Sequence, residues 1–534
     1  MCGIFFVQSK NGLENVHEDG MKGVLDNFYS FQSRGPDRSK HKRQLLNEEK
    51  STERFIGFHR LAINGISEEG DQPITLQDAE NEVNMICNGE IYNYKQLAEE
   101  YDISLTEGCS DCAIIPSLFL KIGIVETISK LDGVFAFVLT HSDKIYIGRD
   151  AIGVRPLFIR KDSLNLVVSS IAKGCEGFKI EGETQQVPPG TLTVFNESNT
   201  LGQNFSQTKW WKLSNPHLNS IQINPASEVR KLLIEATEKR LMSERPVGCL
   251  LSGGLDSSVI AAILAKRVEN LKTFSIGFSS DSTDLKYARL VANHLNTDHS
   301  EIIIPYEKAL SAIPEVIKAT ETTDITTIRA SVGMYLLSEW IKQNTDITVL
   351  YSGEGSDELF CGYLYFHNAP DNKTLEQESK RLVNELHLYD VLRADRTTAV
   401  HGLELRVPFL DKKVVQFAMS LLGEVRTPKN VKNMEKIFLR QAFSDMLPEK
   451  VVWRRKEGFS DGVSNLEKPW YKHIQESLPE EKEVSDVRKE EKFYRQIFDE
   501  NFKDIRNPVP KNWMPKWTNT DDPSGRVIEA FDES

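Results

Sequence analysis

One short stretch of the sequence places hydroxyls, glycines and an acid between two apolar segments. Residues 246–251 indicate a buried strand of a parallel sheet, and apolar residues from Val259 onward recur at helical spacing. The polar residues between them include Ser252, Gly253, Gly254, Asp256, Ser257 and Ser258. Glycines let backbone N–H groups approach an anion, a helix start adds partial positive charge, and hydroxyls donate to phosphate oxygens. The stretch therefore predicts a polyphosphate cradle.

Asp256 adds a requirement to this cradle. A carboxylate beside phosphates is repulsive unless a metal cation lies between them, so we expect Mg²⁺ here. The lysine of the Gly-x4-Gly-Lys-Ser/Thr nucleotide loop is missing, which excludes that motif. The alternative is a tight strand-to-helix turn in which the glycines only relieve crowding.

A second group of glycines and acids follows another predicted buried strand, residues 347–351. This group runs Ser352-Gly353-Glu354-Gly355-Ser356-Asp357-Glu358. Because ligands of such sheets bind at the carboxyl ends of the strands, we expect the two loops to lie side by side. Asp357 could then hold Mg²⁺ together with Asp256. The alternative is a turn with solvated acids.

The second residue of the chain is a candidate nucleophile. Removal of Met1 would leave Cys2 with a free α-amine, which titrates near ~8 and lies within reach of its own thiol. Nucleophile and base would then come from one residue. A lone cysteine beside an apolar strand is more often inert core, so this prediction depends on partners elsewhere in the chain.

Further residues of the N-terminal half could complete a site with this cysteine. The Asn88 amide and the Gly89 N–H could both donate to a developing oxyanion. Arg60 could bind a substrate carboxylate through two hydrogen bonds, and Glu90 and Asp111 could accept from an ammonium group. Together these groups suit glutamine. Taken singly, Asn88-Gly89 could be a hairpin turn, the arginine a surface ion pair and Asp111 a helix cap.

The composition is that of an ordinary globular enzyme. The 534 residues suffice for two or more domains, with 40% hydrophobic and 27% charged residues. A net charge of −13 argues against a general nucleic-acid or anionic-membrane partner, and no apolar run approaches the ~20 residues that span a bilayer. The start lacks a secretory signal, and seven scattered cysteines suit a reducing compartment, so we expect a cytoplasmic protein. The sequence leaves the oligomeric state open, with a homodimer as one alternative.

The predicted elements divide the chain into two domains. The first half is rich in short strands, at residues 55–63, 83–87, 134–139, 145–148, 166–169 and 191–195. Residues 196–219 are polar, so we place the boundary there, with domains 1–208 and 209–534. In the second half three apolar strands alternate with helices, which predicts a doubly wound parallel sheet.

Four segments of the first domain resemble the glutaminase domain of class II glutamine amidotransferases, namely residues 1–5, 34–37, 88–93 and 148–150. The resemblance implies an αββα sandwich, with Cys2 as the nucleophile and with Asn88 and Gly89 as the oxyanion hole. The residues it implies for glutamine binding are Arg60, Leu61, Ala62, Ile63, Asn64, Asn88, Gly89, Glu90 and Asp111.

The cradle resembles the pyrophosphate loop, Ser-Gly-Gly-x-Asp-Ser, of enzymes that split ATP between its α and β phosphates. With segments 324–331, 402–411 and 454–462 in order, nearly the whole chain resembles the glutamine-hydrolysing asparagine synthetase family. The ATP contacts that this resemblance and the cradle imply are Leu251, Ser252, Gly253, Gly254, Asp256, Ser257, Ser258, Ile276, Ser352 and Gly353.

The same resemblance implies roles for four more residues. Glu354 would be needed for the activated intermediate, and Lys456 for charge on the phosphates. Thr326 and Arg329 would bind aspartate. By itself, Lys456 with its neighbouring arginines would more often be a solvated basic patch.

The implied reaction converts aspartate, glutamine, ATP and water into asparagine, glutamate, AMP and pyrophosphate. A thioester on Cys2 would release ammonia, which attacks β-aspartyl-AMP. In one alternative, the two domains are the same but the acceptor substrate is not aspartate, as in β-lactam synthetases. Another is a catalytically silent sensor, although the nucleophile and the metal carboxylates that such copies often lose are all present.

Two features receive no function. Cys109 and Cys112 have the spacing of a redox or metal pair, but the chain has no second pair and no thioredoxin-like setting. Residues 479–492 mix acids and lysines, which predicts a solvated helix or a mobile segment.

Overall fold

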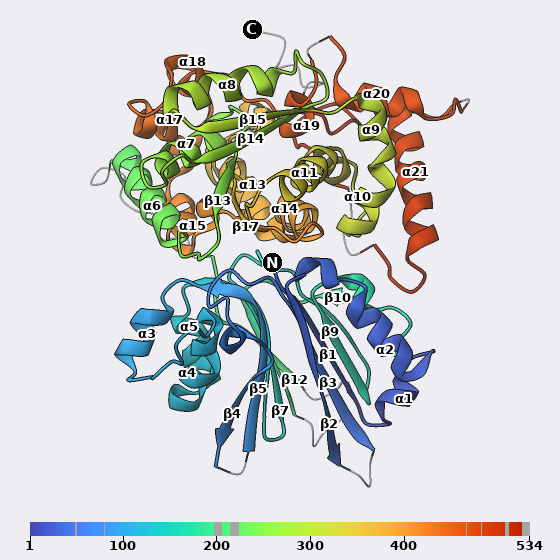
Figure 1. The fold of residues 1–534 in the computed structure, drawn as a ribbon. Coiled ribbons are helices and arrows are strands. Elements are labelled where there is room, and N and C mark those ends of the chain that lie inside the picture. The colour runs from blue at the N-terminus through green and yellow to red at the C-terminus, as the bar shows by residue number, and fades with distance from the viewer. Residues whose placement is uncertain are drawn as a thin grey trace.

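The computed structural model describes residues 1–47, 51–79, 81–196, 205–213, 224–465, 467–481, 483–507 and 512–525. These residues form two stacked domains, and the N-terminus lies between them (Figure 1). Among the described residues, no helix combines the length and the apolar character that a membrane span requires. Much of the polar stretch predicted to join the domains, residues 197–204 and 214–219, lies outside the described ranges.

The N-terminal domain contains two six-stranded antiparallel sheets. The first sheet has the order β10 (Gln185–Gln186), β8 (Phe158–Lys161), β9 (Asn165–Ser169), β1 (Gly3–Ser9), β3 (Thr52–Arg60) and β2 (Arg38–Asn47). The second has the order β12 (Phe205–Lys209), β11 (Thr191–Asn196), β7 (Lys144–Arg149), β6 (Gly133–His141), β5 (Asn81–Ile91) and β4 (Ile74–Asp78).

Alternating apolar side chains explain why these sheets form the middle of four layers. In β1, Ile4 and Phe6 pack in the cluster between the sheets, whereas Phe5 and Val7 pack toward the helices outside. The outer helices are α1 (Leu13–Val16) and α2 (Gly20–Tyr29) on the first sheet, and α3 (Tyr94–Glu100), α4 (Ile114–Ile122) and α5 (Ile124–Lys130) on the second (Figure 1). The predicted αββα sandwich is confirmed.

The C-terminal domain is built on a five-stranded parallel sheet. Its order is β15 (Asp298–Ile303), β14 (Lys272–Gly277), β13 (Val247–Leu250), β16 (Val349–Tyr351) and β17 (Glu404–Arg406). The chain moves outward from β13 to β15 and then returns to the other side of β13 at β16. The crevice at the carboxyl ends of β13 and β16 is therefore the topological switch point where ligands bind. The predicted doubly wound parallel sheet is confirmed.

Helices surround this sheet. They are α6 (Pro225–Lys239), α7 (Leu255–Ala265), α8 (Thr283–Leu295), α9 (Tyr306–Ser311), α10 (Ile313–Thr320), α11 (Ile325–Asn344), α12 (Ser356–Phe360), α13 (Asn372–Glu385), α14 (Asp390–Ala399), α15 (Lys412–Ser420), α16 (Gly423–Arg426), α17 (Ile437–Phe443), α18 (Glu449–Val452), α19 (Phe459–Gly462), α20 (Trp470–Ser477) and α21 (Asp486–Asn501).

Three segments add detail to the expectation. The segment 402–411 contributes the buried strand β17. The charged segment 479–492 leads into α21, which buries Tyr494 and Phe498. Strand β12 runs across the predicted domain boundary, because Lys209 still pairs with Thr191 of β11. The position of that boundary stays a prediction.

Buried charges join the two domains. Arg34 Nη1 lies 2.7 Å from Asp395 Oδ2, and both side chains are 3% exposed. Glu321 accepts hydrogen bonds from the N–H groups of Ala172 and Lys173 at 2.8 and 2.7 Å. A buried charge whose partner is removed is strongly destabilising, so these pairs fix the domains against each other.

We expect Asp395→Ala to lower the free energy of unfolding by about 3–5 kcal/mol, because it leaves the buried Arg34 guanidinium without its anion. The control is Asp346→Ala, which breaks an exposed pair with Lys272 and should cost less than about 1 kcal/mol. Urea unfolding measures both variants. Equal effects would contradict the importance of the buried pair.

Candidate active sites

A small cavity in the N-terminal domain brings together most of the residues expected to bind glutamine. Its lining includes Cys2, Arg60, Leu61, Ile63, Asn64, Asn88, Gly89, Glu90 and Asp111. Ala62 is not part of this lining: its N–H donates to Asp37 at 2.7 Å, and its carbonyl accepts from Arg245 at 2.9 Å. Glu404 of β17 also lines the cavity, so the C-terminal domain contributes to it.

The Cys2 thiol lies against the backbone of Leu61. The Leu61 N–H donates to Sγ at 3.4 Å, and Sγ donates to the Leu61 carbonyl at 3.7 Å. Burial raises the pKa of the thiol to about 11, so it is protonated at neutral pH and needs a base. With Met1 attached, the Cys2 nitrogen is an amide that donates to Asn88 Oδ1 at 3.1 Å. Removal of Met1 would turn this nitrogen into an amine that can accept the thiol proton.

Asn88 has a free donor beside this nucleophile. Its Nδ2 is buried and has no hydrogen-bond partner among the described residues. Leaving such a group unpaired costs ~1–3 kcal/mol, which a substrate oxyanion would recover. At Gly89 a Cβ would lie 2.5 Å from the Val134 carbonyl oxygen, so only glycine fits this strand position. The arrangement meets the requirement of an oxyanion hole.

Arg60 is held by its own strand and the loop that follows. Its guanidinium donates to the carbonyls of Gly65 and Ser67 and to the Asp71 carboxylate. These contacts orient the side chain. A guanidinium has five N–H groups, and those that the contacts do not use remain available to bind a substrate carboxylate. The expectation of a surface ion pair is wrong, since Arg60 is 3% exposed.

Two acids also line this cavity. Asp111 accepts from the Ile91 N–H at 2.6 Å, and burial raises its pKa to about 6. Glu90 accepts from Asn64 Nδ2 at 2.6 Å, and burial raises its pKa well above the ordinary value. A substrate ammonium group would favour the charged form of both acids.

The cysteine pair noted in the sequence is not a disulfide. All seven cysteines are free, and Cys112 Sγ donates to the Gly89 carbonyl at 3.5 Å. Cys112 therefore packs against the strand of the oxyanion hole. This position supports the interpretation that its Cys-x-x-Cys spacing to Cys109 is a coincidence.

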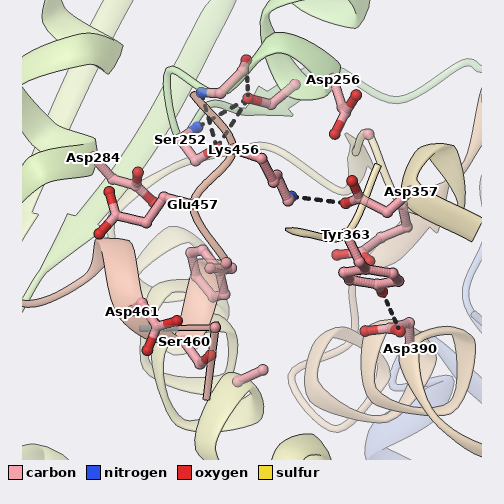
Figure 2. A pocket seen from close by; sticks show the side chains of 18 of the residues that line it. Ser252, Asp256, Asp284, Asp357, Tyr363, Asp390, Lys456, Glu457, Ser460 and Asp461 are labelled. Atoms are coloured by element: carbon pink, nitrogen blue, oxygen red, sulfur yellow. Dashed lines mark hydrogen bonds and ion pairs between the residues drawn. The ribbon is translucent and has the colours of Figure 1, made fainter. Parts of the chain in front are cut away.

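A larger cavity opens at the switch point of the C-terminal sheet (Figure 2). The expected ATP, metal and aspartate residues in its lining are Leu251, Ser252, Gly254, Asp256, Ser257, Ile276, Thr326, Ser352, Gly353, Glu354, Asp357 and Lys456. The two loops that the sequence predicts to meet do meet here, because their strands β13 and β16 are neighbours.

Two residues of the cradle do not line this cavity. Gly253 has a φ of +72°, and a Cβ there would lie 2.3 Å from the Tyr287 backbone. It allows the loop to turn against α8 rather than facing a ligand. Ser258 is fully buried in α7. Contact of Gly253 and Ser258 with ATP stays a prediction.

Asp256 and Asp357 face the same space as Lys456 (Figure 2). Lys456 Nζ lies 2.7 Å from Asp357 Oδ2, and Lys436 Nζ lies within 2.7 Å of both carboxylates. Burial alone would raise the pKa of Asp357, but Lys436 and Lys456 lower it to about 2. Both acids therefore belong to a compact charged cluster in the lining of the cavity.

These two carboxylates fit Mg²⁺, although the described residues contain no group of three metal-binding acids, histidines or cysteines. Mg²⁺ is commonly bound by one or two carboxylates, with substrate phosphates and water as the other ligands. Because Lys436 reaches both carboxylates, they are close enough to share one cation.

Glu354 also lines this cavity. Its Oε2 accepts from Arg393 Nη2 at 2.8 Å, and Arg393 also contacts Asp390. Burial raises the pKa of Glu354. The carboxyl group can therefore hold or release a proton beside a bound substrate, which is the property that a role in the activated intermediate needs.

The two residues expected to bind aspartate differ in their surroundings. Thr326 lines the cavity, and its buried hydroxyl has no hydrogen-bond partner among the described residues. Arg329 does not line the cavity, because its guanidinium is paired with Glu490 and Asp522 at 2.7 Å each. Contact of Arg329 with aspartate stays a prediction, and in this structure the side chain holds the C-terminal segment instead.

That segment, residues 512–525, forms part of the cavity wall. Trp513, Pro515, Pro523 and Gly525 line the cavity. The Trp513 N–H donates to Asp324 at 2.5 Å. The tryptophans and prolines of this segment have no spacing that predicts a ligand from the sequence alone.

Lys436 and Glu404 were also missed. Each is a single charged residue outside any Gly-rich motif, and only the fold brings it to a cavity. The two charged residues that flank Leu405 in this three-residue strand were the one available signal for Glu404.

Models of known protein families match both domains of the chain. A family model for a glutamine amidotransferase domain matches residues 1–200, and one for asparagine synthase matches residues 228–381 and 370–520. The class defined by fold and sites is thus a two-domain protein with an amidotransferase domain and a nucleotide-binding synthase domain.

Curated relatives extend this similarity over most of the chain. The glutamine-hydrolyzing asparagine synthetase of Homo sapiens is 42% identical over 521 residues, which cover 89% of this chain and 91% of the relative. The one from Gallus gallus is 40% identical over 520 residues with the same coverage. The chain belongs to the asparagine synthetase family.

The unpaired donor of Asn88 generates a test. Asn88→Asp keeps an oxygen that can accept from the Cys2 nitrogen but removes the donor, and Asn88→Ala removes both. We expect both variants to lower the kcat of glutamine hydrolysis by about 10²–10³-fold. Ammonia-dependent activity of the other domain serves as the control and should not change. Full glutaminase activity of Asn88→Asp would contradict the oxyanion role.

The pairing of Arg329 generates a second test. Asp522→Asn weakens the contact that holds the C-terminal segment, so we expect ammonia-dependent synthesis to fall about tenfold or more while glutamine hydrolysis is kept. The neighbouring Asp521→Asn changes an exposed side chain and should have no effect. Steady-state assays of both half-reactions measure this, and equal behaviour of the two variants would show that the segment does not shape the cavity.

Proposed function

We propose that this protein makes asparagine from aspartate, with glutamine as the nitrogen donor and ATP as the energy source. The observation that carries the proposal is the position of β17. Glu404, at the start of this strand, lines the cavity around Cys2, and the Arg406 carbonyl at its end accepts from the Ser352 N–H of the ATP loop at 3.0 Å. A single short strand thus connects the two sites, as expected when one makes a reactant for the other.

The first half-reaction uses the N-terminal cavity. After Met1 is removed, the α-amine of Cys2 takes the thiol proton, and Sγ attacks the side-chain amide of glutamine. Asn88 Nδ2 donates to the oxyanion that develops. The amine then returns its proton to the leaving nitrogen, so that ammonia departs, and water hydrolyses the thioester to glutamate.

The substrate is held by its two ends. We propose that Arg60 binds the glutamine carboxylate and that Glu90 and Asp111 bind the ammonium group. The remaining N–H groups of Arg60 and the raised pKa of both buried acids support this assignment. Leu61, Ala62, Ile63 and Asn64 would shape the same wall.

The second half-reaction uses the C-terminal cavity. The side-chain carboxylate of aspartate attacks the α-phosphorus of ATP, which gives β-aspartyl-AMP and pyrophosphate. Leu251 and Ile276 would contact the adenosine, and the Ser252–Ser258 and Ser352–Gly353 loops the phosphates. Lys456 neutralises charge on the departing pyrophosphate, Glu354 assists the intermediate, and Thr326 contacts aspartate. Mg²⁺ held by Asp256 and Asp357 would supply Lewis-acid stabilisation of the phosphate charge.

Ammonia must cross from one cavity to the other as the neutral molecule, because ammonium is not a nucleophile. We propose that it moves through the domain interface near β17. The proposed domains are residues 1–208 and 209–534. The seven free cysteines support a cytoplasmic location, and a homodimer is the first assembly to test.

Cys2→Ala tests the division of labour. We expect glutamine-dependent asparagine formation to fall at least ~10³-fold, because no other group can form the thioester, while synthesis from added ammonia stays within about twofold. Cys109→Ala is the matched control, since this partly exposed thiol of the same domain does not line the cavity. Product analysis follows both reactions.

Loss of both activities in Cys2→Ala would contradict two separable sites. Loss of neither would exclude Cys2 as the nucleophile. Formation of AMP and pyrophosphate without asparagine, when aspartate and ammonia are supplied, would contradict the proposed acceptor.

A further inference from the structure

A buried lysine lies between the two carboxylates proposed for Mg²⁺. Lys436 Nζ is 2.7 Å from Asp256 Oδ2 and 2.6 Å from Asp357 Oδ1, and the side chain is 2% exposed. One ammonium group therefore bridges acids from two different loops. No motif in the sequence drew attention to this residue.

The position of Lys436 is fixed by the surrounding backbone. Its φ is +57°, a left-handed conformation that a residue with a side chain adopts only at a cost. At Gly362 a Cβ would lie 1.9 Å from Lys436 Cε and 2.2 Å from Asp357 Oδ1, so this glycine leaves room for the lysine. The lysine is thus built into the site.

The second lysine of the cluster has a different geometry. Lys456 contacts Asp357 through the other carboxylate oxygen, Oδ2, at 2.7 Å, and it is 20% exposed. Lys456 faces the cavity beside the acid pair (Figure 2), whereas Lys436 contacts both acids at once.

The charges of the cluster balance without a metal ion. Two carboxylates and two ammonium groups sum to zero. A divalent ion that bridges Asp256 and Asp357 would approach their oxygens to about 2.0–2.1 Å, in the space where Lys436 Nζ now lies. Metal and lysine therefore compete for Asp256 Oδ2 and Asp357 Oδ1. Once the metal is bound, the site carries an excess of positive charge that matches a polyphosphate.

We propose that Lys436 is a resident cation that holds the acid pair together and keeps divalent metal out until ATP arrives. The metal then enters with the nucleotide, and the displaced Nζ donates to a phosphate oxygen. Lys436 is thus a positioning residue that makes metal binding depend on the nucleotide. This inference rests on the proposed role of Asp256 and Asp357.

The test measures Mn²⁺ binding to the full chain without nucleotide, by the electron paramagnetic resonance signal of free Mn²⁺. We expect the unaltered protein to bind Mn²⁺ only weakly. Lys436→Met should bind it about tenfold more tightly or better, because the pair of carboxylates then loses the cation that bridges it and keeps only Lys456, which contacts Asp357 alone. Lys436→Arg keeps the charge and should resemble the unaltered protein.

Two controls locate the effect. Lys456→Met should increase Mn²⁺ affinity less than Lys436→Met does, since it leaves the bridging ammonium in place. Adding Asp357→Asn to Lys436→Met should abolish the gain. Glutamine hydrolysis and thermal unfolding report whether each variant is folded.

Unchanged Mn²⁺ affinity in folded Lys436→Met would overturn the inference. Tight nucleotide-independent Mn²⁺ binding by the unaltered protein, lost in Asp357→Asn, would overturn it as well, and this measurement needs no lysine variant. A failure of the proposed metal site gives a different result: binding of Mn²⁺ with ATP would then be unaffected by Asp357→Asn alone.

Discussion

Burial of the chain start between the two domains is the constraint on which the rest of the structure depends. The Met1 amine donates to the Leu403 carbonyl of the C-terminal domain at 3.3 Å, and burial lowers its pKa to about 5. The Met1 amine is therefore neutral near pH 7 in this environment. The same burial places the Cys2 thiol in one cavity with Glu404 of the domain that would consume its product.

In both sites, burial and charge pairing set the protonation of the acids. In the C-terminal cavity, lysines neutralise Asp256 and Asp357, whereas Glu354 is partly compensated by Arg393. In the N-terminal cavity, burial raises the pKa of Glu90 and Asp111. The charges still to be supplied are those of the ligands. An ammonium group would complete the N-terminal cavity, and phosphates with a metal ion would complete the C-terminal cavity.

The sequence predicted the fold and the local motifs well, because they depend on residues that are close together in the sequence. The cradle from Ser252 to Ser258 needs only a strand, glycines and a helix start, and Cys2 needs only its place in the chain. Lys436 and Glu404 could not be found this way, since their partners are distant in sequence. The pairing of Arg329 with Asp522 likewise depends on how the chain end folds back.

Direct transfer of ammonia between the cavities is the central claim, and isotope competition tests it most directly. Glutamine labelled with nitrogen-15 in its amide is supplied together with excess unlabelled ammonium, and the asparagine is analysed by mass spectrometry. The account predicts asparagine enriched in nitrogen-15 well above the ammonium pool in solution. Enrichment equal to that of the pool would mean that ammonia escapes into solution, which would contradict the account.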